Sequence, residues 1–275
     1  MSPAQTALLG GLAGVTIFFG LPLGRVRSDS RTLKTFLNGV SAGILLFLLF
    51  DILENATKSI EGALSAAQQF GTWTHFAGLA VVYCLGLGGG LLSLRYTSAL
   101  WKQRYRGASF GPGAMAVAER DAAHNEALYL AMSIAGGIGL HNFSEGLAIG
   151  QAARSGALSF AILLVVGFAL HNATEGFGIV GPLAANDIRP SWGWLLTAGL
   201  IGGGPTFLGA LLGSSVTSPV IFVGFLTLAG GGILYVVGEL FAAGRRMSWD
   251  VTLWGILGGF LLALATELVL VAAGA

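Results

Sequence analysis

The chain has 275 residues, of which 54% are hydrophobic and only 10% carry a full charge. An ordinary soluble domain carries about 25% charged residues, so this composition excludes a typical water-soluble enzyme and a disordered chain. The net charge of +1 gives no support to a nucleic-acid partner. The single cysteine, Cys84, excludes an internal disulfide and a metal site built from several thiolates.

Long apolar runs separate the few charges. Each run is near or above the about 20 residues that a helix needs to cross the hydrocarbon core of a membrane. The runs lack the alternating pattern of a membrane β-barrel, so we predict an all-α membrane protein, a single domain over residues 1–275 with eight transmembrane helices. No basic segment precedes the first run, so we expect a retained span and no cleaved signal there. The expected spans are about 4–22, 36–56, 75–94, 126–150, 157–183, 192–213, 219–243 and 251–274.

The basic residues fall mainly in alternate loops between these runs. That set of loops holds 12 of the 14 Lys and Arg, and the opposite set holds only Lys58 and Arg154. The positive-inside rule then places the basic loops in the cytoplasm and both termini outside. We expect a multi-pass protein of the cell membrane, a bacterial inner membrane or a plasma membrane. The longest loop, about 95–125, is expected to be cytoplasmic and mobile.

Ionisable residues inside the runs are all acids or histidines. A charge at the bilayer centre costs several kcal/mol, so such residues are candidates for function. Acids without basic partners need a cation, a proton or neutralisation. The pattern therefore indicates a positively charged ligand. These residues include Asp51, Glu54, His141, Glu145, His171, Glu175, Glu239 and Glu267.

One motif, His-Asn-x-x-Glu-Gly, occurs twice, at 141–146 and at 171–176. Within each copy the histidine and the glutamate are four residues apart, so they share one helix face. Both copies fall near the middle of neighbouring spans joined by a short loop. We therefore expect antiparallel helices whose polar faces converge at the membrane midplane.

The converging faces offer two imidazoles, two carboxamides and two carboxylates. Mixed nitrogen and oxygen ligands suit Zn²⁺, and also Fe²⁺, Mn²⁺ or Co²⁺. Two carboxylates balance one divalent cation, which favours a single well-occupied site. The alternative is a hydrogen-bonded polar network that only holds the two helices together. The candidate metal ligands are His141, Asn142, Glu145, His171, Asn172 and Glu175.

With these motifs the chain resembles the ZIP (Zrt/Irt-like protein) family of divalent metal transporters. The family pattern is close to His-Asn-x-Pro-Glu-Gly in span four and x-x-x-Pro-Glu-Gly in span five. The stretches at 204–213 and 235–240 look like its sixth and seventh spans. The resemblance implies import of zinc, iron, manganese or cadmium into the cytoplasm, with no organic cofactor.

The resemblance also implies roles for particular residues. The two histidines and two glutamates of the motifs match a primary metal site, and Asn142 and Asn172 match a second site that shares the glutamates. Asp51 and Glu54 look like acids near the outer mouth. Glu239 looks like an acid on the exit side.

Some positions depart from the family pattern. Ser144 and Thr174 stand where the family usually has proline, and Ser or Thr can bend a helix by bonding back to a carbonyl. Gly204 stands where some members carry a glutamate of the second site. The roles of His124 and Glu267 stay open, as does the oligomeric state, with a homodimer as one alternative.

We therefore predict a metal transporter, not an enzyme. A cation is drawn to the acids of the outer mouth, loses water at the paired motifs, and is released inward when one helix group rocks against another. The alternative is an intramembrane zinc-dependent hydrolase, in which the same ligands activate a water molecule. Against it, the metalloprotease pattern His-Glu-x-x-His is absent from the sequence.

Overall fold

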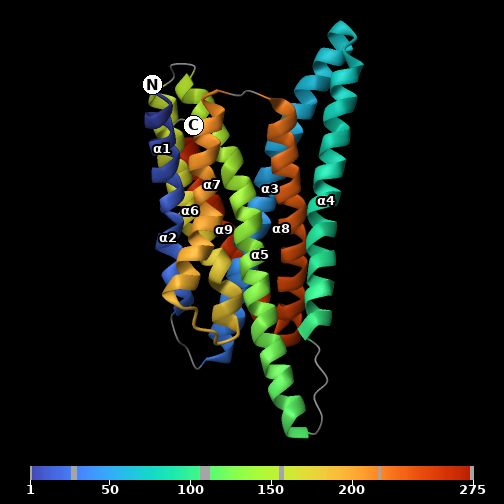
Figure 1. Ribbon diagram of the computed structural model, residues 1–275, viewed down its shortest axis with the longest axis vertical. Helices are drawn as coiled ribbons and strands as arrows, with labels where there is room; N and C mark the ends of the chain where they lie inside the picture. The colour runs from blue at the N-terminus through green and yellow to red at the C-terminus, as the bar shows by residue number, and fades with distance from the viewer. Residues whose placement is uncertain (1, 26–29, 106–111, 155–157, 216–217, 273–275) are drawn as a thin grey trace.

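The computed structural model describes residues 2–25, 30–105, 112–154, 158–215 and 218–272. Over these ranges the chain is helical and contains no strand, which confirms the all-α prediction for the described residues (Figure 1). The helices are α1 (Pro3–Val15), α2 (Ile17–Gly20), the 3₁₀ turn η1 (Leu21–Arg25), α3 (Arg31–Phe70), α4 (Trp73–Tyr105), α5 (Pro112–Arg154), α6 (Leu158–Ala185), α7 (Trp192–Gly213), α8 (Pro219–Met247) and α9 (Trp249–Ala272).

Six helical segments within the described residues are long and apolar enough to cross a membrane. They are the segment from α1 through η1, and α3, α4, α7, α8 and α9. Helices α5 and α6, which carry the two polar motifs, are not among the six. The count of eight crossings therefore remains a prediction. Large apolar side chains along the outside of α4 and α9 are exposed, among them Leu85 and Trp254, as expected for helices that face lipid.

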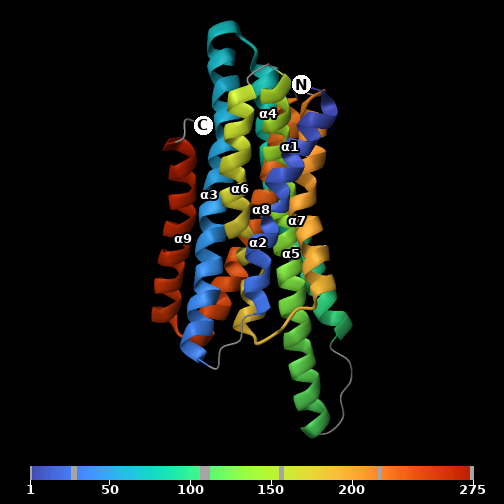
Figure 2. The ribbon, with the colours of Figure 1, turned by 90° about the vertical axis from the view of Figure 1, so that its left-hand side faces the viewer.

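The helices run up and down the length of the molecule, and the N and C labels lie at the same end (Figures 1 and 2). Helices α3, α5 and α7 end there. At the opposite end, basic side chains hold neighbouring segments together. Arg25 donates a hydrogen bond to the carbonyl oxygen of Pro190 and stacks on Trp192, and Lys34 pairs with Asp187.

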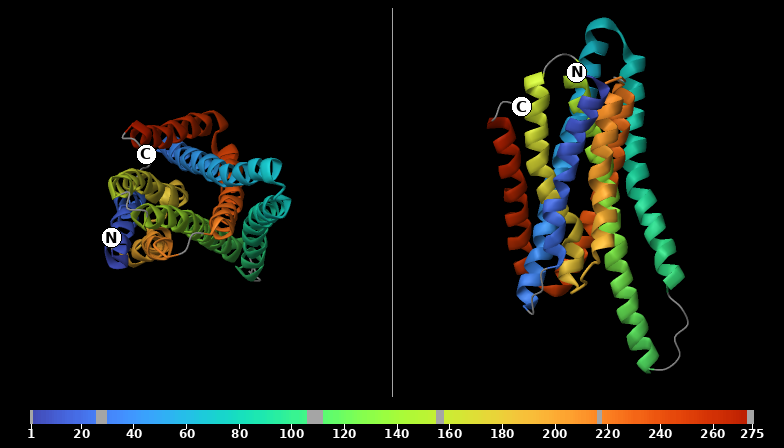
Figure 3. Two further views of the ribbon diagram at one scale, coloured as in Figure 1. Left: turned by 90° about the horizontal axis from the view of Figure 1, so that it is seen from above. Right: turned by 60° about the vertical axis from the view of Figure 1, so that its left-hand side comes forward.

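The bundle has two groups of helices, visible from above in Figure 3. Helices α1, α5, α6 and α7 pack against one another, while α3 packs against both α8 and α9, and α4 packs against α8. The groups meet where α5 contacts α8 and where α6 contacts α3 and α9. Both motif helices thus lie in the first group, along its boundary with the second.

Several helices are longer than the expected spans. Helix α3 continues to Phe70, where Gly71 ends it in a left-handed conformation with φ 73°. The segment expected as a loop at about 95–125 is corrected, because α4 extends to Tyr105 and α5 begins at Pro112. Proline is favoured in the first turn of a helix, so this proline marks a helix start. Residues 106–111 of the expected loop lie outside the described residues.

The first expected span is interrupted. Helix α1 ends at Val15, α2 begins at Ile17, and η1 follows. At the break, the Oγ1 of Thr16 donates to the carbonyl oxygen of Ala13 at 2.6 Å. A hydroxyl that bonds back to the preceding turn competes with the regular helical pattern, which accounts for the interruption without a proline or glycine at that position.

Glycines bring α5 and α7 into close contact and so fix the height of the first motif. A methyl group on Gly209 would collide with the carbonyl oxygen of Phe143, and one on Gly146 with the carbonyl oxygen of Thr206. Each glycine therefore lies directly against the backbone of the facing helix. Small residues permit this approach in membrane bundles, and it places the motif of α5 beside α7.

Candidate metal centre

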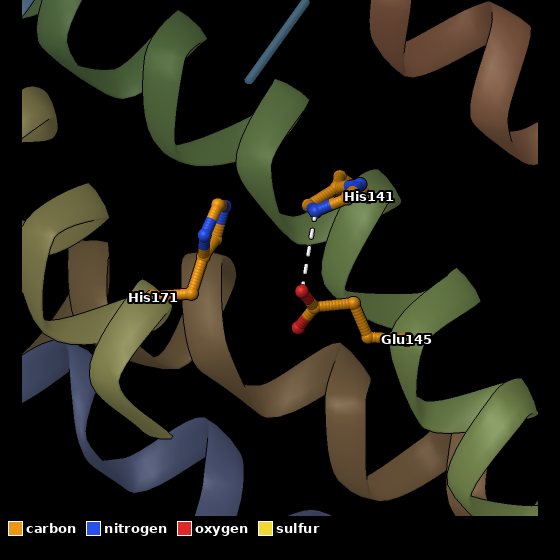
Figure 4. A group of neighbouring side chains, drawn as sticks. All are labelled: His141, Glu145 and His171. Carbon is orange, nitrogen blue, oxygen red and sulfur yellow. Dashed lines mark ion pairs between the residues drawn. The ribbon is translucent and has the colours of Figure 1, made fainter. Parts of the chain in front are cut away.

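Three potential metal ligands meet between α5 and α6. His141 and Glu145 come from successive turns of α5, and His171 comes from α6; their side chains point into the space between the two helices (Figure 4). One ligand atom from each lies within 4.8 Å of the others. All three side chains are buried. The spacing of four residues does place the histidine and the glutamate of α5 on one face.

Glu175 joins this group from α6. Its Oε1 lies 3.5 Å from the Nε2 of His171, one turn earlier, and 3.9 Å from the Nε2 of His141 on the other helix. The Nε2 of His141 is also 3.3 Å from the Oε1 of Glu145. Glu175 is fully buried, and neither of its carboxylate oxygens has a hydrogen-bond partner in the described part of the chain.

These contacts leave buried polar atoms that water no longer solvates. Besides Glu175, the Nε2 of His171 and the Oε2 of Glu145 have no hydrogen-bond partner among the described residues. Orphaned buried groups of this kind are rare in folded proteins and cost free energy unless something satisfies them. A divalent cation would satisfy them, because imidazole nitrogen and carboxylate oxygen are its usual ligands.

An aromatic contact supports the histidine of α6. The ring of Phe47 on α3 lies 6.4 Å from the ring of His171, measured between centroids, and Phe47 itself packs edge-on against Phe260 of α9. The imidazole is therefore held between its own helix and the neighbouring helix group.

The two motif asparagines have matching environments. The Nδ2 of Asn142 donates to the carbonyl oxygen of Gly202 on α7, and the Nδ2 of Asn172 donates to that of Ala13 on α1, each at 3.0 Å. Both Oδ1 atoms are buried without a partner among the described residues. Each asparagine thus ties its helix to a neighbour through its donor and retains one unused acceptor.

A cavity of about 360 Å³ extends from the cluster toward the C-terminal end of α9, where Val271 lines it. His141, Glu145 and His171 form one part of its wall, and Asp51, Asn55 and Lys58 of α3 form another. The side chain of Lys58 is 62% exposed, so the cavity reaches the surface there. The wall carries three carboxylates, from Asp51, Glu145 and Glu267, and one lysine among the described residues.

A second, smaller cavity of about 190 Å³ lies toward the basic end of the bundle, the end opposite the termini, where Arg25 and Lys34 lie. Its lining includes Glu239, Asn38, Glu126, Asn186 and Arg246, and none of its lining residues belongs to the first cavity.

Buried apolar side chains separate the two cavities along several helices. On α5, Ile134 and Ile138 lie between the residues that line the two cavities. Ile179 occupies the corresponding place on α6, and Ile233 occupies it on α8. These side chains pack in one core cluster. The cluster of ligands is therefore open toward one end and closed toward the other.

The structure brings together most of the residues that the sequence singled out. The four histidines and glutamates of the motifs converge, with both asparagines beside them, and Asp51 faces the same cavity. Glu54 does not line it, but pairs with Lys58, which does, at 2.8 Å. Glu239 lies apart, in the smaller cavity. His124 is exposed and is not a member of the cluster.

Three further polar residues line the cavity although the sequence did not predict them there. The sequence leaves the role of Glu267 open, and its side chain lines the same cavity as Asp51. Asn55 donates to the Oδ1 of Asp51 at 2.9 Å, and the spacing of four residues was the signal for it. Ser144 lines the cavity as well.

Comparison with known protein families identifies the family of the chain. The family described as ZIP Zinc transporter matches residues 103–267, more than half of the chain and both motifs. The chain belongs to the ZIP family. ZIP proteins are membrane proteins that transport divalent metal, so the cation is substrate. A search of curated proteins finds no match.

The two family prolines are replaced differently in this ZIP protein. The Oγ1 of Thr174 donates to the carbonyl oxygen of His171 at 2.7 Å, as expected for a hydroxyl that bends its own helix. Ser144 forms no such bond among the described residues: its Oγ is buried and has no partner. The expectation of a bond back to the helix is met at Thr174 only.

Proposed function

We propose that the protein carries divalent cations, Zn²⁺ foremost, across the cell membrane into the cytoplasm. The ion binds between α5 and α6, to His141, Glu145, His171 and Glu175. The observation that carries the proposal is the buried cluster itself, in which His141, Glu145 and His171 have unsatisfied nitrogens or oxygens and line the cavity of about 360 Å³. Two imidazoles and two carboxylates fill the four positions that Zn²⁺ prefers, and the two negative charges balance the ion.

One bound ion is the stoichiometry that this arrangement favours. The unused Oδ1 atoms of Asn142 and Asn172 offer weaker, neutral oxygen ligands beside the main set. At Gly204, where some relatives carry a further acid, a side chain would meet no atom within 4 Å. Because glycine supplies no carboxylate there, a second ion lacks this charge partner, so any second occupancy is weak.

The two cavities and the distribution of charge support inward transport. The larger cavity leads from the ligands past Asp51 to the end where the termini lie, and the smaller cavity, with Glu239, lies toward the basic end. The positive-inside rule assigns the basic end to the cytoplasm. The ion thus enters from outside, and release requires the apolar side chains around Ile138 and Ile233 to separate. Movement of the group containing α5 and α6 against the other helices is the motion proposed for this step.

The hydrolase alternative receives no support from the family comparison, which is to transporters. The two readings also differ in the route they need. A hydrolase requires one blind pocket, whereas a transporter needs polar groups on both sides of the ion site. Glu239 with Asn186 in the smaller cavity supplies such groups on the second side.

Uptake into proteoliposomes tests the proposal. Purified protein is reconstituted with a zinc-sensitive dye inside the vesicles, and initial rates are compared for the wild type, Glu175→Gln and Glu61→Gln. Glu61 is an exposed glutamate of α3 and serves as the matched control. We expect uptake to fall at least tenfold in Glu175→Gln and to stay unchanged in Glu61→Gln. Undiminished uptake in Glu175→Gln would overturn the site.

Cysteine labelling in intact cells tests the orientation. Cys84 is first changed to Ser, and single cysteines are placed at Thr72, between α3 and α4, and at Ser191, just before α7 at the other end. An impermeant maleimide should label Thr72→Cys in intact cells and Ser191→Cys only after permeabilisation. The reverse pattern would place the termini in the cytoplasm and refute the proposed direction.

A further inference from the structure

Ser144 and Thr174 occupy the same position in the two copies of the motif, yet their hydroxyls are used differently. Thr174 is half-buried and donates to its own helix. Ser144 is 2% exposed, and its Oγ has no hydrogen-bond partner among the described residues. A serine inside a helix normally bonds back to a carbonyl or faces water, so an orphaned buried hydroxyl needs another explanation.

The position of Ser144 supplies that explanation. It lines the same cavity as His141, Glu145 and His171. Because it follows His141 by three residues, it lies on the same face of α5 as that ligand. A hydroxyl oxygen has acceptor lone pairs and one proton to donate. It can therefore ligate a cation or donate to a water molecule that the cation retains.

We propose that Ser144 is an additional oxygen ligand of the transported cation, directly or through one retained water, and that it widens the choice of metal. This inference rests on the proposed metal site. Four ligands suit tetrahedral Zn²⁺, whereas Mn²⁺ prefers more ligands and more oxygen. A fifth, neutral oxygen thus helps the oxygen-preferring cations more than it helps Zn²⁺. The proline usual at this position in the family has no hydroxyl and cannot make this contribution.

Paired uptake measurements test the inference. Initial rates for Zn²⁺ and for Mn²⁺ are measured for Ser144→Ala, Ser144→Thr and Thr174→Ala. Loss of one hydrogen bond or neutral ligand corresponds to about a two- to tenfold change. We expect the KM for Mn²⁺ to rise by that factor relative to the KM for Zn²⁺ in Ser144→Ala. Ser144→Thr should keep the wild-type ratio because it keeps the hydroxyl, and so should Thr174→Ala, because its hydroxyl serves its own helix.

Metal binding to purified protein provides a second readout that does not depend on transport. Free Mn²⁺ is counted by its electron paramagnetic resonance signal as protein is added, and Zn²⁺ is then used to displace bound Mn²⁺. Ser144→Ala should bind Mn²⁺ more weakly and release it at lower Zn²⁺. Ser144→Cys supplies a soft thiol in place of the hydroxyl, so it should favour Cd²⁺ over Mn²⁺.

The outcomes separate the two proposals. If the Mn²⁺ to Zn²⁺ ratio is unchanged in both Ser144→Ala and Ser144→Cys while Glu175→Gln abolishes uptake, the ion site stands and the role of Ser144 is refuted. If Glu175→Gln transports normally, the ion site itself fails. An equal shift in Thr174→Ala would also refute the inference, because it would assign the effect to helix bending.

Discussion

His141 on α5 and Glu175 on α6 approach each other to 3.9 Å, between Nε2 and Oε1, across the boundary between the two motif helices. The other two histidine–glutamate contacts join residues of the same helix, His141 with Glu145 and His171 with Glu175. The cross-helix contact is thus the place where the two copies of the motif act together. An ion bound there would hold α5 and α6 at a fixed separation.

The first prediction concerns this pair. His141→Ala and Glu175→Gln should each weaken Zn²⁺ binding at least tenfold, as measured by calorimetry on purified protein. Because both side chains would ligate one ion, the double variant should lose less than the product of the two single losses. Groups in one network usually show such non-additivity, whereas distant groups add.

The control for this cycle pairs His141→Ala with Glu61→Gln, whose side chain is exposed on α3. These two changes should combine additively, with Glu61→Gln contributing nothing measurable. Full additivity for His141 with Glu175 would show that the two residues do not bind the same ion. The proposal of one site with four ligands would then be wrong.

The second prediction concerns pH. The carboxylates and imidazoles must be free of protons to ligate the ion, so binding releases protons from whichever of them are protonated beforehand. Lowering the pH adds protons that the ion must displace, and the Kd for Zn²⁺ should therefore rise; raising the pH removes this competition. Calorimetry in buffers of different ionisation heat measures the protons released, which should be fewer in Glu175→Gln. An affinity independent of pH would contradict carboxylate and imidazole ligation.

Hydropathy and spacing predicted the positions of the helices and the pairing of the motifs, because both depend on regular features of the sequence. The ends of the helices could be predicted less well from the sequence. A polar segment such as 56–70 of α3 is still a good helix former, but hydropathy reports only the part of a helix that suits a membrane. The same reason explains why residues 113–125 were expected in a loop, although α5 already begins at Pro112.

Side-chain environments in the site could be predicted only in part. The spacing of four residues placed His141 and Glu145 on one face, and their helices proved to be neighbours. By contrast, Ser144 and Thr174 occupy equivalent motif positions, and no local pattern distinguishes them. Their hydroxyls differ because only one of them faces the cavity, and this depends on how α5 and α6 pack against the other helices.

The third prediction concerns the mouth of the larger cavity. Lys58 lines it and pairs with Glu54 at 2.8 Å, so a fixed positive charge stands on the route of an incoming cation. Lys58→Gln should remove this repulsion and release Glu54 to attract the metal. Exposed ion pairs contribute about 0.2–1 kcal/mol, so the KM for Zn²⁺ should fall at most about fivefold, with little change in the maximal rate.

Salt dependence checks the electrostatic origin of this effect. Surface charges are screened as ionic strength rises, so the difference between wild type and Lys58→Gln should shrink in higher salt. Lys58→Arg keeps the charge and should behave like the wild type. Equal KM values for wild type and Lys58→Gln at low salt would show that Lys58 does not influence the approaching ion.

The fourth prediction concerns the contact of α5 with α7. In Gly209→Ala the new methyl group meets the backbone of Phe143 and Leu147, two residues before and two after Glu145. Neither backbone can move without displacing α5, so the cost should be about 1–3 kcal/mol, as for other overpacked sites. The Tm in detergent should fall by several degrees, and uptake should fall with it because the motif of α5 is displaced.

Gly62→Ala is the matched control for Gly209→Ala, since a methyl group there meets no atom within 4 Å and alanine favours the helix. Its Tm should be equal to that of the wild type or slightly higher. A wild-type Tm in Gly209→Ala would mean that the backbones of α5 and α7 are not in direct contact and that the position of the first motif is set by other helices.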